Sequence, residues 1–363
     1  MITALLVIAI LVLLIVSHEL GHFIAAKIFK VRVDEFGIGY PPRAFLFGRI
    51  GDTEYTFNWI PFGGFVRLFG EDGAWAKENG SFAHADAWKQ AVILIAGVAA
   101  NALVAWMLFA TALYIGVPRI IDTPQMGQVV KLVISDVVAG SPADVGGLIA
   151  GDEITAFIDT NGEQPMALSP DGVVDFVSER GGKPLSVTYV REHTENTVVM
   201  RPANSIIPGA ADRPALGVGL VLVGDESLPL LQSVSEGFWT SLRAFGYVSN
   251  SLWTMIVGSI RGTVDISQVV GPVGLVGVIG DASRNGAGYV LELAAFIAVN
   301  LAIINLIPIP ALDGGRLVMV GIEAILRRPP PKIIMQVINT IGIALVIFLM
   351  LTVTYHDIVR LFT

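Results

Sequence analysis

The sequence predicts an α-helical polytopic membrane protein with four transmembrane helices and a strand-rich domain inserted between the second and the third. Hydrophobic residues make up 53% of the 363 residues and charged residues only 15%. The mean hydropathy of +0.69 lies above the usual range of soluble proteins. Four apolar stretches are long enough to cross about 30 Å of hydrocarbon at about 1.5 Å per residue. The segment between the second and the third stretch shows short alternating runs and turn clusters instead.

The four predicted spans cover residues 2–26, 91–117, 288–309 and 337–354. The first could instead be a cleaved signal peptide, but no Lys or Arg precedes Lys27, so the charged n-region of such a peptide is missing. A further apolar stretch, 228–262, is interrupted by Ser, Asn and Arg. It fits either a fifth span or an amphipathic helix lying in the membrane interface.

The positive charges predict the orientation, because cytoplasmic loops carry an excess of Lys and Arg. The loop after the first span and the loop before the fourth are rich in these residues, so we expect both to face the cytoplasm. Both termini and residues 118–287 would then lie on the outer side. The charges are Lys27, Lys30, Arg32, Arg43, Arg49, Arg67, Lys77 and Lys89 in the first loop and Arg316, Arg327, Arg328 and Lys332 in the second.

Composition also excludes several functions. The formal net charge is −8, the pI is about 5.1, and the sequence has no basic stripe, so we expect no nucleic-acid partner. Cysteine is absent, so the chain has neither disulfides nor thiolate ligands. Any bound metal must be held by His, Asp or Glu.

The first span contains "HELGH", with His18 and His22 four residues apart and Glu19 between them. On a helix the two imidazoles share one face and can hold one zinc ion, which leaves Glu19 free to act on a water molecule. A charged residue in a spanning helix costs about 2.5 to 3.5 kcal/mol, so such residues are functional by default. A proton relay or a structural polar cluster is the alternative.

Hydrolytic zinc sites usually have three protein ligands, and Asp313 in "NLIPIPALDGG" is the best placed third one. Pro308 and Pro310 prevent ordinary helix there, and Gly314 and Gly315 allow a sharp turn. Asp313 reaches the depth of His18 only if the first and third spans run in the same direction. A fifth crossing within 228–262 would put it on the wrong side, so we assign that stretch to the outer interface.

Together these motifs resemble the site-2 protease family of intramembrane zinc proteases, in its bacterial group. "SPADVGGLIAGDEI" is similar to a PDZ-domain segment, with Gly146 where alanine is usual, and "GIGYPPR" and "FNWIPFGGFVRL" are similar to the family's membrane-reentrant β-loop. "AGVAAN" resembles the family pattern of the second span, with Val98 in place of proline. The resemblance implies four parts: 1–117 with the β-loop at 33–70, a PDZ-like domain at 120–205, a linker with the interfacial helix at 206–285, and 286–363.

Carried over to this sequence, the resemblance implies that His18, His22 and Asp313 bind Zn²⁺ and that Glu19 is the catalytic acid/base. It further implies that Asn305 contacts the substrate backbone or the developing oxyanion. The implied activity is cleavage within transmembrane segments of single-span proteins in the bacterial inner membrane, such as anti-sigma factors or remnant signal peptides. The PDZ-like domain would contact the outer part of the substrate from the periplasmic side, with the active site toward the cytoplasm.

Several alternatives stay open. A zinc-dependent transporter or metal sensor would use the same ligands, but it would not need Glu19 as a base; a PDZ adaptor with an inactive hydrolase fold is the other rival. Tyr55, Phe57 and Trp59 alternate with polar residues, which fits a strand that could pair with substrate or a plain hairpin. We expect Asn101 to make an interhelical hydrogen bond. Glu323 could orient a metal-binding side chain by contacting it, without binding the metal itself. The remaining histidines, His84, His193 and His356, are expected at the surface.

Overall fold

The protein was analysed as a computed structural model, which describes residues 2–71, 78–122, 130–191, 194–204, 213–262, 271–284, 286–326 and 332–360. Lys77, His193, Arg327 and Arg328 lie outside these residues. The described chain forms two compact units, one of residues 1–115 and 228–363 and the other of residues 116–227. The first unit is helical apart from one long β-hairpin, and the second contains a six-stranded sheet.

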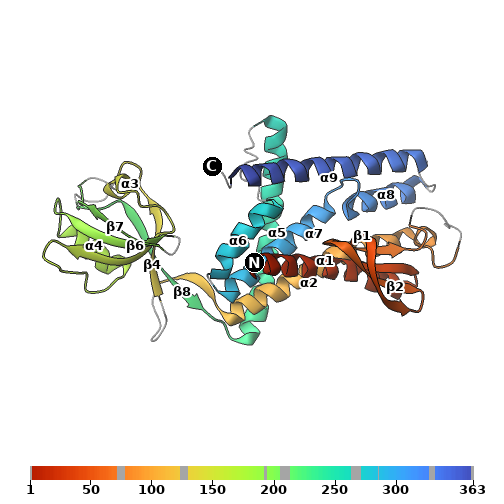
Figure 1. The fold of residues 1–363 in the computed structure, drawn as a ribbon, viewed down its shortest axis with the longest axis horizontal. Helices are drawn as coiled ribbons and strands as arrows, with labels where there is room; N and C mark the ends of the chain where they lie inside the picture. The colour runs from red at the N-terminus through yellow and green to blue at the C-terminus, as the bar shows by residue number, and fades with distance from the viewer. Residues whose placement is uncertain are drawn as a thin grey trace. The chain divides into compact units, whose positions relative to one another are not determined.

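Among the described residues, four helices are long and apolar enough to cross a membrane, which confirms the four predicted spans. In Figure 1, the axes of α1, α2 and α9 lie roughly along one another, and α2 packs against both α1 and α7. The core between them is formed by small and branched side chains such as Leu14, Ala105 and Val299, each fully or almost fully buried. The four helices are α1 (Ile2–Ile28), α2 (Ala87–Ile115), α7 (Ala287–Leu306) and α9 (Lys332–Arg360).

Two further helices of this unit do not run alongside the spans. Helix α5 (Leu230–Arg261) crosses them at a steep angle in Figure 1. One face of α5 joins the core through Ala244 and Val248, while Trp239 and Trp253 on another face are exposed. Helix α6 (Pro272–Arg284) follows, and its first turn is held by the buried carboxylate of Asp357, which accepts the Gly271 and Gly274 backbone N–H groups at 3.1 and 2.8 Å.

The hairpin of β1 (Val33–Ile50) and β2 (Thr53–Leu68) folds back on itself beside α1. Residues 35–38 of β1 pair with two stretches of β2, residues 54–57 and residues 64–67. The predicted alternation is present, but its apolar side chains point outward. Phe57 and Trp59 are exposed, whereas Thr56 and Asn58 are buried. This is the reverse of a water-soluble strand and fits a hairpin whose outer surface meets lipid.

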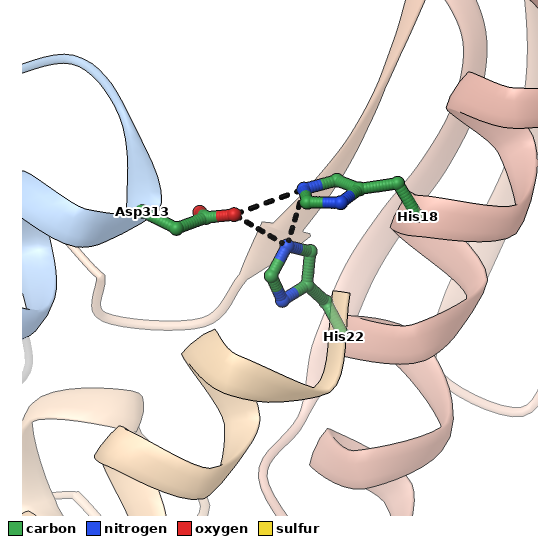
Figure 2. A group of neighbouring side chains, drawn as sticks. All are labelled: His18, His22 and Asp313. Atoms are coloured by element: carbon green, nitrogen blue, oxygen red, sulfur yellow. Dashed lines mark hydrogen bonds and ion pairs between the residues drawn. The ribbon is translucent and has the colours of Figure 1, made fainter. Parts of the chain in front are cut away.

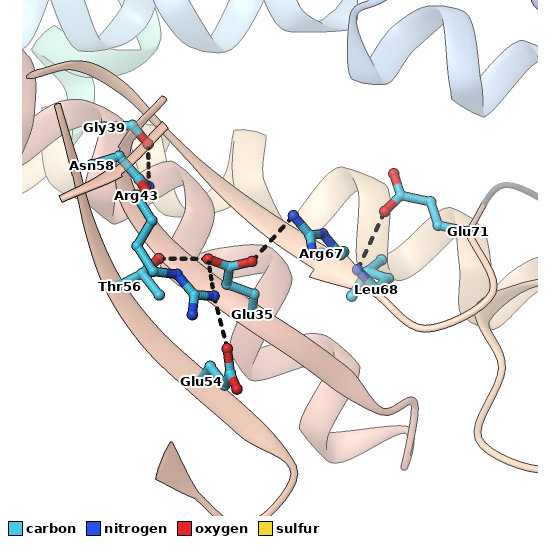
Figure 3. Close-up of polar contacts among 9 residues, drawn as sticks. All are labelled: Glu35, Gly39, Arg43, Glu54, Thr56, Asn58, Arg67, Leu68 and Glu71. Atoms are coloured by element: carbon cyan, nitrogen blue, oxygen red, sulfur yellow. Dashed lines mark hydrogen bonds and ion pairs between the residues drawn. The ribbon is translucent and has the colours of Figure 1, made fainter. Parts of the chain in front are cut away.

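A buried carboxylate fixes the bend of this hairpin. Glu35 accepts the Thr56 hydroxyl at 2.8 Å and forms ion pairs of 3.1 Å with both Arg43 and Arg67 (Figure 3). The Glu35 side chain is only 6% exposed. Removing Arg43 or Arg67 would therefore leave its buried negative charge poorly compensated. The three stretches of the hairpin are therefore held in one register around Glu35.

The inserted unit is an antiparallel sheet with the strand order β3-β8-β4-β5-β6-β7, consistent with the expected PDZ-like domain. Its core includes Leu132, Ile154, Phe157 and Val187. The unit is longer than 120–205, because β8 pairs with both β3 and β4 and so belongs to the sheet. The strands are β3 (Val117–Ile121), β4 (Val130–Val137), β5 (Glu153–Asp159), β6 (Leu185–Arg191), β7 (Thr194–Met200) and β8 (Val218–Glu226).

Two short helices complete this unit, α3 (Pro142–Val145) and α4 (Pro170–Ser178). Each begins with a serine cap followed by proline. Ser141 Oγ accepts the Asp144 N–H and Ser169 Oγ accepts the Gly172 N–H, both at 3.2 Å. The "SPAD" and "SPDG" stretches therefore start helices by ordinary N-capping.

Asp152 stabilises the inserted unit in a pH-dependent way. Its buried carboxylate accepts two hydrogen bonds from Arg191 and one from the Ile149 N–H. Burial alone would raise the pKa of Asp152, but these bonds outweigh burial and lower it. A carboxyl group whose pKa is lower in the folded state stabilises the fold above its unfolded pKa of about 3.9, and this stabilisation is lost as the pH falls through the folded pKa.

We therefore expect Asp152→Asn to destabilise the inserted unit by about 1 to 2 kcal/mol at pH 7, because Arg191 loses its charged partner and is itself one-third exposed. The wild type should lose the same contribution below about pH 4. Hydrogen exchange of the β5 and β6 amides in the full chain, corrected for the intrinsic rate, measures both effects. Asp175→Asn, an exposed change on α4, is the control; equal protection in the two variants would contradict the assignment.

Candidate metal centre

Helix α1 presents both predicted histidines on one face. His18 and His22 are 8% and 7% exposed, with ring centroids 4.7 Å apart and their planes nearly perpendicular. Their side chains point away from the α1 axis toward the same small region (Figure 2). The two Nε2 atoms lie 3.1 Å apart inside the helical bundle. Two free lone pairs at this distance repel each other, so the arrangement requires a shared proton or a shared cation.

Asp313 reaches this region from the start of α8 (Asp313–Leu326). Helix α7 ends at Leu306, and the chain passes through Pro308 and Pro310 before α8 begins. The sharp turn falls at Ala311, whose φ is +78°, and not at Gly314 and Gly315, where the sequence predicts it.

Gly314 and Gly315 lie in the first turn of α8 and serve close packing. A Cβ at Gly314 would lie 2.4 Å from the Leu306 and Ile307 carbonyl oxygens, and one at Gly315 would lie 2.3 Å from that of Ile309. The glycines therefore let α8 begin directly against the end of α7, which fixes the position of Asp313.

The three side chains form a compact triangle of donor atoms. Asp313 Oδ2 lies 2.9 Å from His18 Nε2 and 3.2 Å from His22 Nε2. The donor atoms of the ligands of a tetrahedral zinc ion stand about 3.3 Å apart when each bond is about 2.0 to 2.1 Å. Among the described residues this is the group of His, Asp and Glu that could hold a metal ion. Its nitrogen and oxygen donors and its spacing fit zinc.

A backbone contact orients one of the imidazoles. His22 Nδ1 lies 2.8 Å from the Ile93 carbonyl oxygen of α2. A carbonyl can only accept, so Nδ1 carries the proton and the Nε2 lone pair points toward His18 and Asp313. This is the arrangement that ligating histidines generally show.

Gly97 of α2 makes room for both imidazoles. A Cβ at this position would lie 2.4 Å from His22 Nε2 and 2.8 Å from His18 Cε1. Gly21 on α1 plays a similar part, since its Cβ would meet the Ala96 carbonyl oxygen at 2.2 Å. Small residues therefore bring α1 and α2 close enough for the backbone of α2 to line the site.

We expect Gly97→Ala to weaken zinc binding by at least about 10-fold, by analogy with changes in the surroundings of metal ligands. In an ordinary helix the same change would stabilise the protein by up to about 1 kcal/mol. Gly246→Ala in α5 is the matched control, because its Cβ would meet no atom within 4 Å. Zinc titration of the purified variants decides the outcome: unchanged affinity in Gly97→Ala would show that the imidazoles do not need this space.

Glu19 lies next to the triangle without belonging to it. Its carboxylate lies close to the charges of His18, His22 and Asp313 and to the Val66 backbone N–H of β2. The β2 backbone also touches it at Gly64, where a Cβ would be 3.2 Å from Glu19 Cγ. The hairpin therefore lies against Glu19, an acidic side chain beside the triangle that is not one of its three members.

Asn305, near the end of α7, also reaches the site, with its Nδ2 atom 3.4 Å from His18 Nε2.

The other residues that the sequence singles out lie away from the site. Among the described residues, no hydrogen bond or ion pair joins Glu323 to the site. His84 is exposed as expected, but His356 is half-buried on α9 and lies 3.0 Å from the Thr352 carbonyl oxygen of its own helix. His356 therefore lies only partly at the surface.

Comparisons with known proteins agree with this geometry. The model of peptidase family M50 matches residues 6–349. A protein of Clostridium perfringens, named as a zinc metalloprotease, is 31% identical to this chain over 95% of each chain. The zinc metalloproteases RasP of Geobacillus kaustophilus and Bacillus licheniformis are 26% and 27% identical, over 96% of this chain and 96% and 97% of theirs.

The four spans, the hairpin and the histidine–aspartate triangle define a multi-pass membrane protein with a buried group of ligand atoms that could hold a metal ion within the helical unit. With the matches over nearly its full length, the chain belongs to peptidase family M50, the site-2 proteases, and is an intramembrane zinc metalloprotease.

Proposed function

We propose that this protease cuts single-span membrane proteins within their transmembrane segments, with anti-sigma factors and remnant signal peptides as candidate substrate classes. In this proposal His18, His22 and Asp313 hold the zinc ion, Glu19 is the general base and acid, and Asn305 contacts the substrate backbone or the developing oxyanion. The observation that carries the assignment is the triangle of donor atoms with a separate carboxylate beside it.

Zinc, when bound, acts as a Lewis acid on the scissile carbonyl and makes water a better nucleophile near neutral pH. The chain supplies the rest. Glu19 takes a proton from the attacking water and returns one to the leaving amine. The Val66 N–H of the hairpin lies close to the Glu19 carboxylate. The Asn305 amide stands 3.4 Å from His18 Nε2, so it can donate to an oxygen at the reacting carbon.

A helical substrate must unwind first, because its carbonyl groups are hydrogen-bonded within the helix. The hairpin offers a place for the unwound segment. Residues 64–67 of β2 pair on one side with residues 35–38, and the β2 strand packs against α1. An extended substrate that adds to this part of β2 would lie beside Glu19, which supports the hairpin as the substrate-holding element.

Orientation is part of the proposal. We place the hairpin on the cytoplasmic side and the inserted unit on the periplasmic side of a bacterial inner membrane, because the Lys and Arg residues gather in the loops that flank the site. The chain has no cysteine, so single cysteines report the topology cleanly. In intact spheroplasts an impermeant maleimide should label Asn161→Cys and leave Asp52→Cys unlabelled. The opposite pattern would reverse the orientation.

The substrate class is tested by co-expression with single-span proteins whose outer parts have been shortened. Cells with the wild type should produce the cut form, and cells with Glu19→Gln should accumulate the uncut form. A cut site mapped by mass spectrometry within the span supports the proposal. Cleavage confined to loops outside the span, or equal processing by both forms, would overturn it.

A further inference from the structure

Two buried polar atoms near the metal centre lack a hydrogen-bond partner among the described residues, His18 Nδ1 and Asn101 Nδ2. Asn101 is 1% exposed and lies on α2 within the membrane-spanning part. An unpaired buried polar group costs about 1 to 3 kcal/mol. His22 has its backbone partner at Ile93, so His18 is the imidazole that still needs one.

Asn101 and His18 face the same stretch of the interface between α1 and α2. Asn101 follows Gly97 by four residues, so it lies one turn further on the same face of α2. The missing Cβ of Gly97 would be 2.8 Å from His18 Cε1, the ring atom bonded to Nδ1. Ser17, the residue before His18, lies 3.4 Å from Asn101 Oδ1 through its Oγ.

The hydrogen atoms available at Ser17 decide which way the Asn101 amide faces. Ser17 Oγ has one hydrogen, and it is donated to the Leu14 carbonyl at 2.9 Å. Ser17 can therefore only accept from Asn101, which requires the amide NH₂ group to face it. The two orientations of an amide have the same shape. With the NH₂ group facing Ser17, the Asn101 carbonyl oxygen takes the place of the atom that has no hydrogen-bond partner.

We propose that Asn101 is a positioning residue for the metal centre: its side-chain oxygen accepts the His18 Nδ1–H through one buried water. A buried water needs at least two polar partners, and His18 Nδ1 and the Asn101 side-chain oxygen provide two. The bridge keeps the proton on Nδ1, so the His18 Nε2 lone pair points toward Asp313 and His22. This inference rests on the proposed ligand role of His18 and goes beyond it, since it assigns a partner to the ligand.

The test measures zinc affinity of the detergent-solubilised full chain by competition with a chromogenic chelator. Asn101→Leu removes the accepting oxygen at nearly the same volume, and we expect about 10- to 100-fold weaker binding, as for other partners of metal-bound histidines. Asn101→Asp keeps an accepting oxygen, and the Ser17 hydroxyl can turn its hydrogen from the Leu14 carbonyl to the second carboxylate oxygen, so this variant should bind within a few-fold of the wild type. Asn300→Leu is the matched control, because Asn300 Nδ2 donates to the Phe296 carbonyl of its own helix.

Thermal unfolding without zinc separates folding from metal binding. Unchanged affinity in Asn101→Leu, or a 10-fold loss in Asn101→Asp, would show that Asn101 only packs helices. If Asn101→Leu does not fold, the aspartate variant alone decides by the same criterion. Failure of the metal centre itself looks different: the wild type would bind no zinc, or Asp313→Ala would bind it as tightly as the wild type.

Discussion

Replacing Glu19 with glutamine is expected to lower the cleavage rate by about 10²- to 10⁴-fold, the usual contribution of a positioned general base, while zinc stays bound. The donor atoms of the metal triangle come from His18, His22 and Asp313, so the change removes no ligand. Glutamine has nearly the shape of glutamate, so the change should disturb the packing around this position little. What it cannot do is take a proton from water.

Single-turnover cleavage of a reconstituted single-span substrate, together with the zinc content per chain, measures both halves of this expectation. Retained cleavage would exclude Glu19 as the base. Loss of zinc from Glu19→Gln would instead make Glu19 a ligand and would leave the site without a free carboxylate. A Glu236→Gln variant is the control, because Glu236 pairs with Arg243 on the surface of α5 and should leave both readouts unchanged.

The parts of the site that the sequence predicts are those governed by local geometry. The spacing of His18 and His22 fixes their common face on any helix. The length and apolarity of the four spans are likewise properties of short windows, and these spans are found. The depth of Asp313 in the membrane depends only on the number of crossings between two spans, and the structure brings Asp313 to the two histidines.

What the sequence could not show depends on contacts between distant residues. Gly97 and the Ile93 carbonyl oxygen matter because α2 lies against α1, and nothing in their own neighbourhood marks them as part of a site. The motif "AGVAAN" contains Gly97, but its glycine differs in no local property from a glycine that only packs helices. Likewise, β8 belongs to the inserted sheet through pairing with strands more than 80 residues earlier in the chain.

The hairpin shows a second kind of limit. Alternation at Tyr55, Phe57 and Trp59 predicts a strand with one apolar face, but it does not say whether that face is buried or meets lipid. The structure buries the polar side, with Thr56 bonded to Glu35 and Asn58 bonded to the Gly39 carbonyl (Figure 3). The charged network around Glu35 therefore acts as the core of the hairpin, which a rule for water-soluble strands would place at the surface.

Removing Asp313 is expected to weaken zinc binding by about 100-fold or more. The binding energy of a structural zinc site, about 10 to 16 kcal/mol over its ligands, corresponds to roughly 3 kcal/mol for each. Asp313→Ala would leave two neutral imidazoles on α1 and no anionic ligand. Asp357→Asn is the matched control: it also changes a buried aspartate, but one that holds the first turn of α6, so it should leave zinc affinity unchanged.

The same variant tests whether the metal joins the two ends of the membrane unit. His18 and His22 lie in the first helix, and Asp313 lies almost 300 residues later, so zinc bound by all three ties α1 to α8. Zinc at 1,000 times its dissociation constant should stabilise the wild type by about 4 kcal/mol. Asp313→Ala should lose most of that stabilisation at the same zinc concentration, measured by thermal unfolding. An equal zinc-dependent shift in both proteins would mean that the metal binds α1 alone, and Asp313 would then have no part in the centre.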